Sequence, residues 1–387
     1  MGSFTHGKFS RKKLEGLMGL TSNVVLALAV VLAVALFAAT VWLWPRLAGG
    51  GGRAVLGRVG LLVATQVALF ASVGLAANNS FLFYGSWADL FGQEQDLGVV
   101  VDHSAGSGDV RVLGTQPVDV PGGDRPSVGG QIQKVVIAGE KSRIDSQAYV
   151  YLPPEYFQPR YARSTFPAAV VLTGYPGTAE NLLKGLRYPR TAFQQVKEGR
   201  MRPMVLVMLR PTVAPPRDTE CVDVPGGPQT ETFFAEDLPK AVSETYRVGT
   251  KPRNWGFMGN STGGYCALKI ALHHPDRFAA GAGFSAYYRA AEDVTTGDLF
   301  RGDAAARRRA DLLWSLDHVK QGRSSFLVTT SKQGEGNLKG TQEFIAKVRS
   351  PARVSSITLE SGGHNFNTWN REIPPGLVWM SGRLSAN

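Results

Sequence analysis

The feature that most constrains this chain is a short strand, a sharp turn and a helix in direct succession. Residues 253–258 are apolar and aromatic, which predicts a buried strand, and residues 265–273 have helical spacing. Between them, Gly259-Asn-Ser-Thr-Gly263 matches the pattern G-x-S-x-G. In this context the pattern indicates a nucleophile elbow, in which Ser261 projects its hydroxyl from a strained turn. The alternative is an ordinary glycine-rich turn between a strand and a helix.

Two features of the turn favour the elbow. Bulky side chains at positions 259 and 263 would collide with the neighbouring strand and helix, which explains the glycines. The amide of Thr262 would stand at a helix N-terminus, where it can donate a hydrogen bond to a developing oxyanion.

Apolar strands alternate with amphipathic helices from residue 166 onward, after a pair of strands at 132–137 and 147–152. This alternation predicts an α/β fold with a mostly parallel sheet covered by helices on both faces. The expected strands are 167–172, 204–209, 253–258, 280–284, 325–330 and 353–359, and the further helices are 179–196, 233–246 and 339–348.

Two uncharged apolar runs precede this domain, Val24–Trp44 and Val59–Ala77, and neither has a polar face. Each is long enough to cross a bilayer core of roughly 30 Å, which predicts a transmembrane hairpin. The expected organisation is an N-terminal segment at 1–20, the hairpin at 21–77, an interfacial segment and linker at 78–130, and the α/β domain at 131–387.

The charges around the hairpin give conflicting signals for its orientation. The loop between the runs carries Arg46, Arg53 and Arg58, which places the loop in the cytoplasm and the α/β domain outside. Four basic residues before the first run favour the opposite arrangement. Translation from Met18 would remove those residues and resolve the conflict.

Overall composition narrows the function further. The formal net charge is +11, but there is no block of like charge and no alternation of basic and aromatic residues, so a nucleic-acid partner has little support. No cluster of histidine and cysteine indicates a metal site, and the serine chemistry requires no cofactor.

A serine nucleophile needs a base, and His364 is the best candidate among six histidines. It lies in Ser361-Gly-Gly-His-Asn-Phe366, directly after the last expected strand, where active-site groups of α/β folds collect. The alternative is a turn histidine without a role. The other five are expected in the N-terminal segment, the linker, a helix C-terminus or a solvated helix: His6, His103, His273, His274 and His318.

The orienting acid should lie between the serine and the histidine in the chain. Glu335 is the carboxylate in the loop after the strand 325–330, whereas Glu343 lies in the following helix and is expected to face solvent. Three aspartates come earlier, in a polar excursion at 292–309 that could cap the site: Asp293, Asp298 and Asp303. A solvated loop glutamate is the alternative for Glu335.

The second oxyanion donor is expected in the loop Thr173-Gly-Tyr-Pro-Gly177, which follows the strand 167–172. Because Pro176 has no N–H, the amide of Tyr175 is the candidate. A plain Pro-Gly turn is the alternative.

From about residue 147 to the C-terminus, the chain resembles the esterase D and mycolyltransferase family of α/β-hydrolases. The resemblance is carried by residues 149–154, the Leu172-Thr-Gly-Tyr loop, the elbow, the Glu335 loop, and Gly362-Gly-His-Asn365 followed by Trp369. It implies that Ser261 is the nucleophile, His364 the base and Glu335 the acid, with Thr262 and Tyr175 as oxyanion donors. Two positions depart from the family, which commonly has Met at position 262 and, in the mycolyltransferases, Arg at position 176.

The two cysteines of the chain, Cys221 and Cys266, permit one disulfide. Cys266 lies one turn after Ser261, and Cys221 lies in a long loop, 211–227, that is expected to cross near the same edge of the sheet. A disulfide would stiffen the rim of the site and would form in an oxidising compartment. Two separate buried thiols are the alternative.

These observations predict a membrane-anchored, extracytoplasmic serine esterase that works through an acyl-enzyme on an ester, with an envelope lipid or glycolipid as the favoured substrate class. An acyltransferase would use the same residues, so the two activities are not separated at this stage. The hypothesis from a different class is a catalytically silent protein that binds an envelope component.

Overall fold

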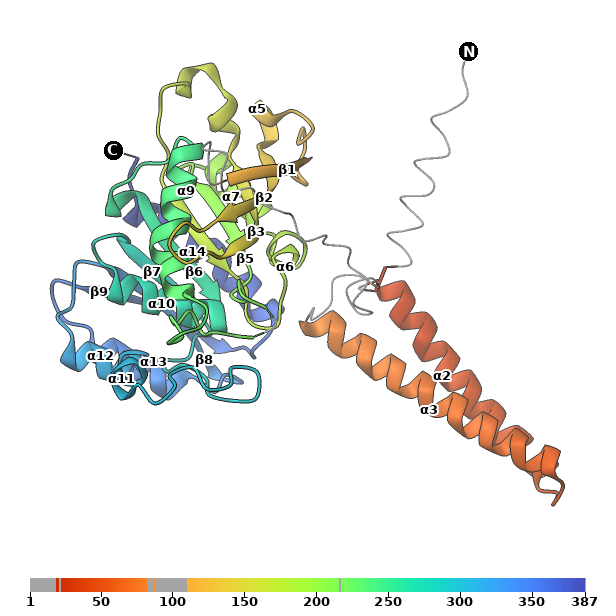
Figure 1. Cartoon of the computed structure of the whole chain (residues 1–387). Coiled ribbons are helices and arrows are strands. Elements are labelled where there is room, and N and C mark those ends of the chain that lie inside the picture. The colour runs from red at the N-terminus through yellow and green to blue at the C-terminus, as the bar shows by residue number, and fades with distance from the viewer. Residues whose placement is uncertain (1–18, 21, 82–86, 88–109, 216, 387) are drawn as a thin grey trace, which may run out of the picture. The chain divides into compact units, whose positions relative to one another are not determined.

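The computed structural model describes residues 19–20, 22–81, 87, 110–215 and 217–386, in two compact units that divide near residue 97 (Figure 1). The basic N-terminal segment, Met18, His6, His103 and most of the expected interfacial segment lie outside the described residues.

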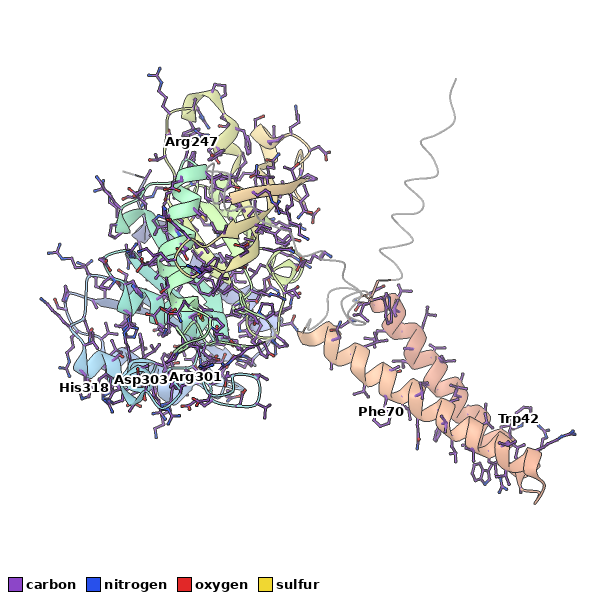
Figure 2. The ribbon with its side chains drawn as sticks, in the orientation of Figure 1. Trp42, Phe70, Arg247, Arg301, Asp303 and His318 are labelled. Carbon is purple, nitrogen blue, oxygen red and sulfur yellow. A yellow bond between two sulfur atoms is a disulfide. The ribbon has the colours of Figure 1, made fainter. Side chains whose placement is uncertain are left out.

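The first unit is a pair of helices, α2 (Asn23–Leu43) and α3 (Gly52–Phe81), joined by the short helix η1 (Pro45–Leu47). Where they pack, the hydroxyls of Thr40 and Thr65 lie 3.1 Å apart and are buried. Large apolar side chains such as Trp42 and Phe70 instead point outward (Figure 2). Both helices are long and apolar enough to cross a membrane.

The second unit is built on a nine-stranded sheet with the order β1-β2-β3-β5-β4-β6-β7-β8-β9. The strands from β5 to β9 in this order run parallel, and β1, β2 and β3 continue the sheet in antiparallel fashion. The strands are β1 (Val110–Pro117), β2 (Gln131–Ala138), β3 (Asp145–Leu152), β4 (Ala168–Leu172), β5 (Val205–Leu209), β6 (Trp255–Asn260), β7 (Ala280–Phe284), β8 (Ser325–Gln333) and β9 (Arg353–Ser361).

Helices cover both faces of this sheet. The central strands β4 and β5 are buried along their whole length, as their unbroken apolar sequences require when both faces are covered. A Cβ at Gly281 of β7 would touch Ala267 of α10 (Thr262–His273), whereas a Cβ at Gly256 of β6 would touch Met380 of α14 (Phe366–Arg383). The other α-helices are α5 (Pro126–Gly129), α6 (Glu180–Lys184), α7 (Tyr188–Lys197), α8 (Thr230–Thr232), α9 (Leu238–Thr245), α11 (Ala304–Arg309), α12 (Leu312–His318) and α13 (Leu338–Lys347).

The mostly parallel sheet between helices confirms the predicted class, but several elements differ from the prediction. The segment expected as a linker contains β1, which pairs with β2 and so belongs to the sheet. The helix expected at 179–196 is two helices, because Arg187 adopts a left-handed φ of 51° between α6 and α7. The helix expected at 233–246 begins with a π-helical turn ahead of Pro239, which cannot donate a backbone hydrogen bond. The C-terminal helix α14 was not predicted.

Candidate active site

The turn between β6 and α10 has the geometry that the G-x-S-x-G pattern requires. Ser261 sits at φ 55° and ψ −122°, a strained conformation for a residue with a side chain. A Cβ at Gly259 would lie 2.6 Å from the backbone of Gly263, and a Cβ at Gly263 would lie 2.4 Å from the carbonyl oxygen of Thr173. Glycine is therefore required on both sides of the serine.

His364 reaches this serine from the loop after β9. Its Nε2 lies 2.9 Å from the Ser261 Oγ, which is hydrogen-bonding distance for transfer of the hydroxyl proton. The imidazole is half-exposed, and the Trp369 ring packs against it in a T-shaped contact at a centroid distance of 5.2 Å. The histidine is thus open to a ligand on one side and packed on the other.

Glu335 lies behind the histidine, in the loop after β8. Its Oε2 is 3.7 Å from His364 Nδ1, which is an ion-pair distance that is too long for a hydrogen bond. The carboxylate is almost completely buried, with 2% of its side chain exposed. Catalytic hydrogen bonds of this kind are commonly longer in the free protein and tighten when a substrate binds.

The loops that carry the acid and the base touch directly. Gly334 has φ +94°, and a Cβ there would lie 2.4 Å from the carbonyl oxygen of Gly362. The amide of Gly362 donates to the carbonyl of Gln333 at 3.0 Å. This close approach of two glycines brings Glu335 under His364.

A serine outside the elbow, Ser285, holds Glu335 in place, and sequence reasoning missed it. The Ser285 hydroxyl donates to Glu335 Oε1 at 2.6 Å and accepts from Trp369 Nε1 at 2.8 Å. The Ser285 amide donates to the Thr329 hydroxyl, although Ser285 itself has a left-handed φ of 46°. The sequence signal that could have identified Ser285 is its position directly after β7, at the carboxyl edge of the sheet, where active-site groups collect.

A second carboxyl group, that of Glu372 on α14, lies close to Glu335 in the buried region. Burial raises the pKa of Glu372 to about 8, and the charge of Glu335 adds a smaller increase. Glu372 is therefore protonated at neutral pH, so a second negative charge beside Glu335 is avoided.

The backbone amides of Thr262 and Tyr175 lie in the two segments that adjoin the serine. The amide of Thr262 is in the first turn of α10, where helix geometry provides no intrahelical partner. Gly174 packs so closely that a Cβ there would lie 2.8 Å from the Ser261 Cβ, and Tyr175 follows it. Among the described residues, the Tyr175 amide has no protein hydrogen-bond partner. That these two amides act as oxyanion donors stays a prediction.

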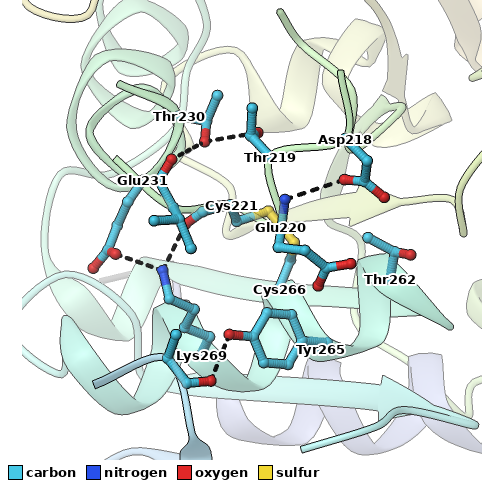
Figure 3. The surroundings of a disulfide bond; sticks show 12 residues. Asp218, Thr219, Glu220, Cys221, Thr230, Glu231, Thr262, Tyr265, Cys266 and Lys269 are labelled. Carbon is cyan, nitrogen blue, oxygen red and sulfur yellow. Dashed lines mark hydrogen bonds and ion pairs between the residues drawn. A yellow bond between two sulfur atoms is a disulfide. The ribbon is translucent and has the colours of Figure 1, made fainter. Parts of the chain in front are cut away.

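The disulfide ties a loop to the helix that begins at the serine (Figure 3). Cys221 and Cys266 are bonded, with their Cα atoms 5.7 Å apart, so the pairing considered from the sequence is present. The disulfide fixes the position of the preceding residue, Glu220. The Glu220 carboxyl group accepts a hydrogen bond from the Tyr287 hydroxyl at 2.6 Å, and this hydroxyl also lies 3.0 Å from Thr262 Oγ1. Burial raises the pKa of Glu220 to about 8.

The remaining histidines and acidic candidates lie apart from this cluster. His273 and His274 bond to the Arg309 carbonyl and to Glu231, and burial lowers the pKa of His273 to about 3, so it is not the cation expected at a helix end. His318 is exposed and stacks on Trp314. The other candidates lie elsewhere: Asp293, Asp298 and Asp303 in local turns or caps, and Glu343 exposed on α13. In the described part of the chain, no three metal-ligating side chains gather.

The model of the family described as "Putative esterase" matches residues 143–380, well over half of the chain. The chain belongs to this esterase family. Its curated relatives include an uncharacterized protein of Corynebacterium glutamicum, 26% identical over 67% of this chain and 63% of that protein. Another is the diacylglycerol acyltransferase/mycolyltransferase Ag85A of Mycobacterium ulcerans, 26% identical over 36% of this chain and 47% of that protein. The chain thus spans less than two thirds of the length of either relative.

Solved structures show the same fold. The S-formylglutathione hydrolase of Agrobacterium tumefaciens aligns with a TM-score of 0.56 at 18% identity, over 71% of this chain and all of that chain. A ferulic acid esterase aligns with a TM-score of 0.55 at 18% identity, over 66% of this chain and 98% of that one. The second unit therefore has the α/β-hydrolase fold that the resemblance implied.

Proposed function

We propose that this protein is a membrane-anchored, extracytoplasmic serine esterase that cleaves carboxylic esters through an acyl-enzyme. The observation that carries the proposal is the contact of His364 Nε2 with the Ser261 Oγ at 2.9 Å, on a strained turn beside the buried Glu335. Membership of an esterase family supports the reaction class.

In the proposed mechanism, His364 removes the hydroxyl proton of Ser261 as the oxygen attacks the ester carbonyl. The amides of Thr262 and Tyr175 stabilise the resulting oxyanion. His364 then protonates the departing alcohol, and Glu335 stabilises the imidazolium and keeps Nε2 directed at the serine. Water attacks the acyl-enzyme in a second cycle of the same steps and releases the acid.

Acyl transfer is the second candidate, because the relative from M. ulcerans is named as a diacylglycerol acyltransferase/mycolyltransferase. The acyl-enzyme would be the same, and an alcohol would replace water in the second step. The exposed site and the two apolar helices support an envelope lipid or glycolipid as donor or acceptor.

The anchoring and the side of the membrane are also proposals. The outward apolar side chains of α2 and α3, and the three arginines near their connection, support a hairpin with its loop in the cytoplasm. The Cys221–Cys266 disulfide supports an oxidising location for the α/β unit. The corresponding domain proposal is an anchor at 21–77 and a catalytic domain that includes β1.

An acceptor-competition assay tests the reaction. The full chain in detergent micelles is given an acyl ester with water alone or with an added alcohol, and released acid and transferred acyl product are both measured. Acid as the main product supports the esterase, and acyl product that rises with alcohol concentration supports the transferase. Neither product, from a protein that is folded, would contradict both.

A further inference from the structure

The strongest feature outside the catalytic cluster is a cavity of about 690 Å³ beside the loop that contacts the nucleophile. It is lined by Tyr175, by Arg217 from the loop before the disulfide, and by part of the 292–309 excursion: Val294, Thr295, Gly297, Asp298 and Arg301. This volume is in the range of sites for small organic ligands.

The cavity adjoins the nucleophile through its Tyr175 wall. Gly174, the preceding residue, packs against the Ser261 side chain, where a Cβ would come within 2.8 Å. A group bound in the cavity could therefore belong to the same molecule as an ester carbonyl at Ser261.

Two guanidinium groups supply a positive charge to the cavity. Arg217 donates from Nε to the carbonyl of Thr296, and its Nη2 is buried without a hydrogen-bond partner. Arg301 is exposed on the excursion (Figure 2), and its Nη1 would be 3.3 Å from a Cβ at Gly226, so it reaches back to the loop that carries Arg217. Among the described residues, neither guanidinium forms a salt bridge.

Asp298, the acidic residue in the lining of the cavity, already accepts hydrogen bonds from backbone amides. Asp298 Oδ1 accepts from the amides of Phe300 at 3.2 Å and Arg301 at 2.7 Å. These bonds fix the turn that presents Arg301. The cavity thus has two guanidinium groups against one carboxylate, and the Nη2 of Arg217 has no protein acceptor.

We propose that this cavity is a subsite for a phosphate group carried by the ester substrate of Ser261. Guanidinium groups bind such oxyanions through paired, charge-assisted hydrogen bonds. The Tyr175 ring provides an apolar surface for the carbon skeleton next to the anion. The proposal rests on the proposed esterase function and adds the charge of the substrate to it.

Two esters that differ in one phosphate test the subsite on the full chain in detergent micelles: 1-butyryl glycerol 3-phosphate and 1-monobutyrin. The phosphate ester should have a kcat/KM at least about tenfold higher, mainly through KM, as expected for a charge-assisted hydrogen bond. Addition of about 0.5 M salt should reduce this preference, because salt screens the attraction between the guanidinium groups and the phosphate. Equal kcat/KM values for the two esters would overturn the proposal.

Substitutions in the cavity test which residues cause the preference for the phosphate ester. Arg301→Gln, at an exposed position, and Arg217→Gln should each reduce the ratio of the two kcat/KM values, whereas Arg217→Lys should retain most of it. Asp298→Asn keeps the oxygen that accepts from the backbone but removes a negative charge, so it should increase the ratio. Arg308→Gln, on α11 outside the cavity, is the matched control and should leave the ratio unchanged. A ratio that none of the pocket variants alters would place the preference elsewhere.

A binding measurement separates this proposal from the catalytic one. Calorimetry with the Ser261→Ala variant measures the affinity of glycerol 3-phosphate, inorganic phosphate and glycerol, whether or not the wild type is active. Glycerol 3-phosphate should bind, and Arg217→Gln should weaken it about tenfold. No binding, or equal binding of inorganic phosphate, would overturn a substrate subsite, whereas absent hydrolysis with intact binding would contradict only the esterase.

Discussion

Replacement of Glu372 by glutamine should make the protein less sensitive to alkaline pH. In the folded chain, burial and the charge of Glu335 raise the pKa of Glu372 from 4.5 to about 8. The unfolded chain therefore releases this proton at a lower pH than the folded chain. The Glu372 contribution to the free energy of unfolding is complete below pH 4.5 and is lost as the pH rises through about 8.

The size of the effect follows from this difference in pKa. Each pKa unit corresponds to about 1.4 kcal/mol, so the wild type should lose at most about 3–4 kcal/mol of its free energy of unfolding through Glu372 between pH 5 and pH 8. Glutamine is close in size to protonated glutamate and does not ionise. The Glu372→Gln variant should therefore lose less stability than the wild type over this range.

The assay is denaturant unfolding of the full chain in detergent micelles, followed by tryptophan fluorescence from pH 5 to pH 8. The difference between the two proteins isolates Glu372, because Glu220 and Asp218 ionise equally in both. Glu343→Gln, at an exposed position on α13, is the matched control. If the free energy of unfolding changed with pH in the same way in the wild type and in Glu372→Gln, the reasoning would be refuted.

The other predictions concern the supports of the site. Ser285→Ala should lower kcat roughly tenfold with little change in KM, because it removes a charge-assisted hydrogen bond to the buried acid; steady-state kinetics check this, and an unchanged kcat would contradict it. Replacement of both Cys221 and Cys266 by serine should lower the free energy of unfolding by about 2–4 kcal/mol, measured by denaturation with and without reductant, and equal stability would count against it. Gly174→Ala should lower kcat about 100-fold by displacing the nucleophile, whereas Gly336→Ala, with open space around it, should not.

The sequence predicted the parallel strands β4, β5, β6, β7 and β8 because they are buried along all or most of their length and so appear as short apolar runs. It missed β1, an edge strand with seven of its eight residues exposed, because Val110–Pro117 has no buried face to produce a pattern. It also missed α14, where Pro374 and Pro375 interrupt the helical signal and tertiary packing overrides propensity.

In the candidate site, too, residues with a local sequence pattern were predicted, and residues that depend on contacts between distant segments were not. Ser261 and His364 stand in glycine-rich motifs whose spacing reports a required backbone geometry, and Glu335 follows from the chain order of the elements. Ser285 and Glu372 act through contacts between segments far apart in the chain, for which a single sequence has no local pattern. The two arginines of the cavity were likewise visible only once the loop and the excursion lay side by side.

The most direct measurement of the central claim is fluorophosphonate labelling of the full chain in detergent micelles, beside its Ser261→Ala variant. Ser243→Ala, on α9, is the matched control for the loss of a hydroxyl. The account predicts that the wild type and the control label covalently and that Ser261→Ala does not, because only an activated serine reacts. A folded wild type that does not label, or a Ser261→Ala variant that labels equally, would contradict it.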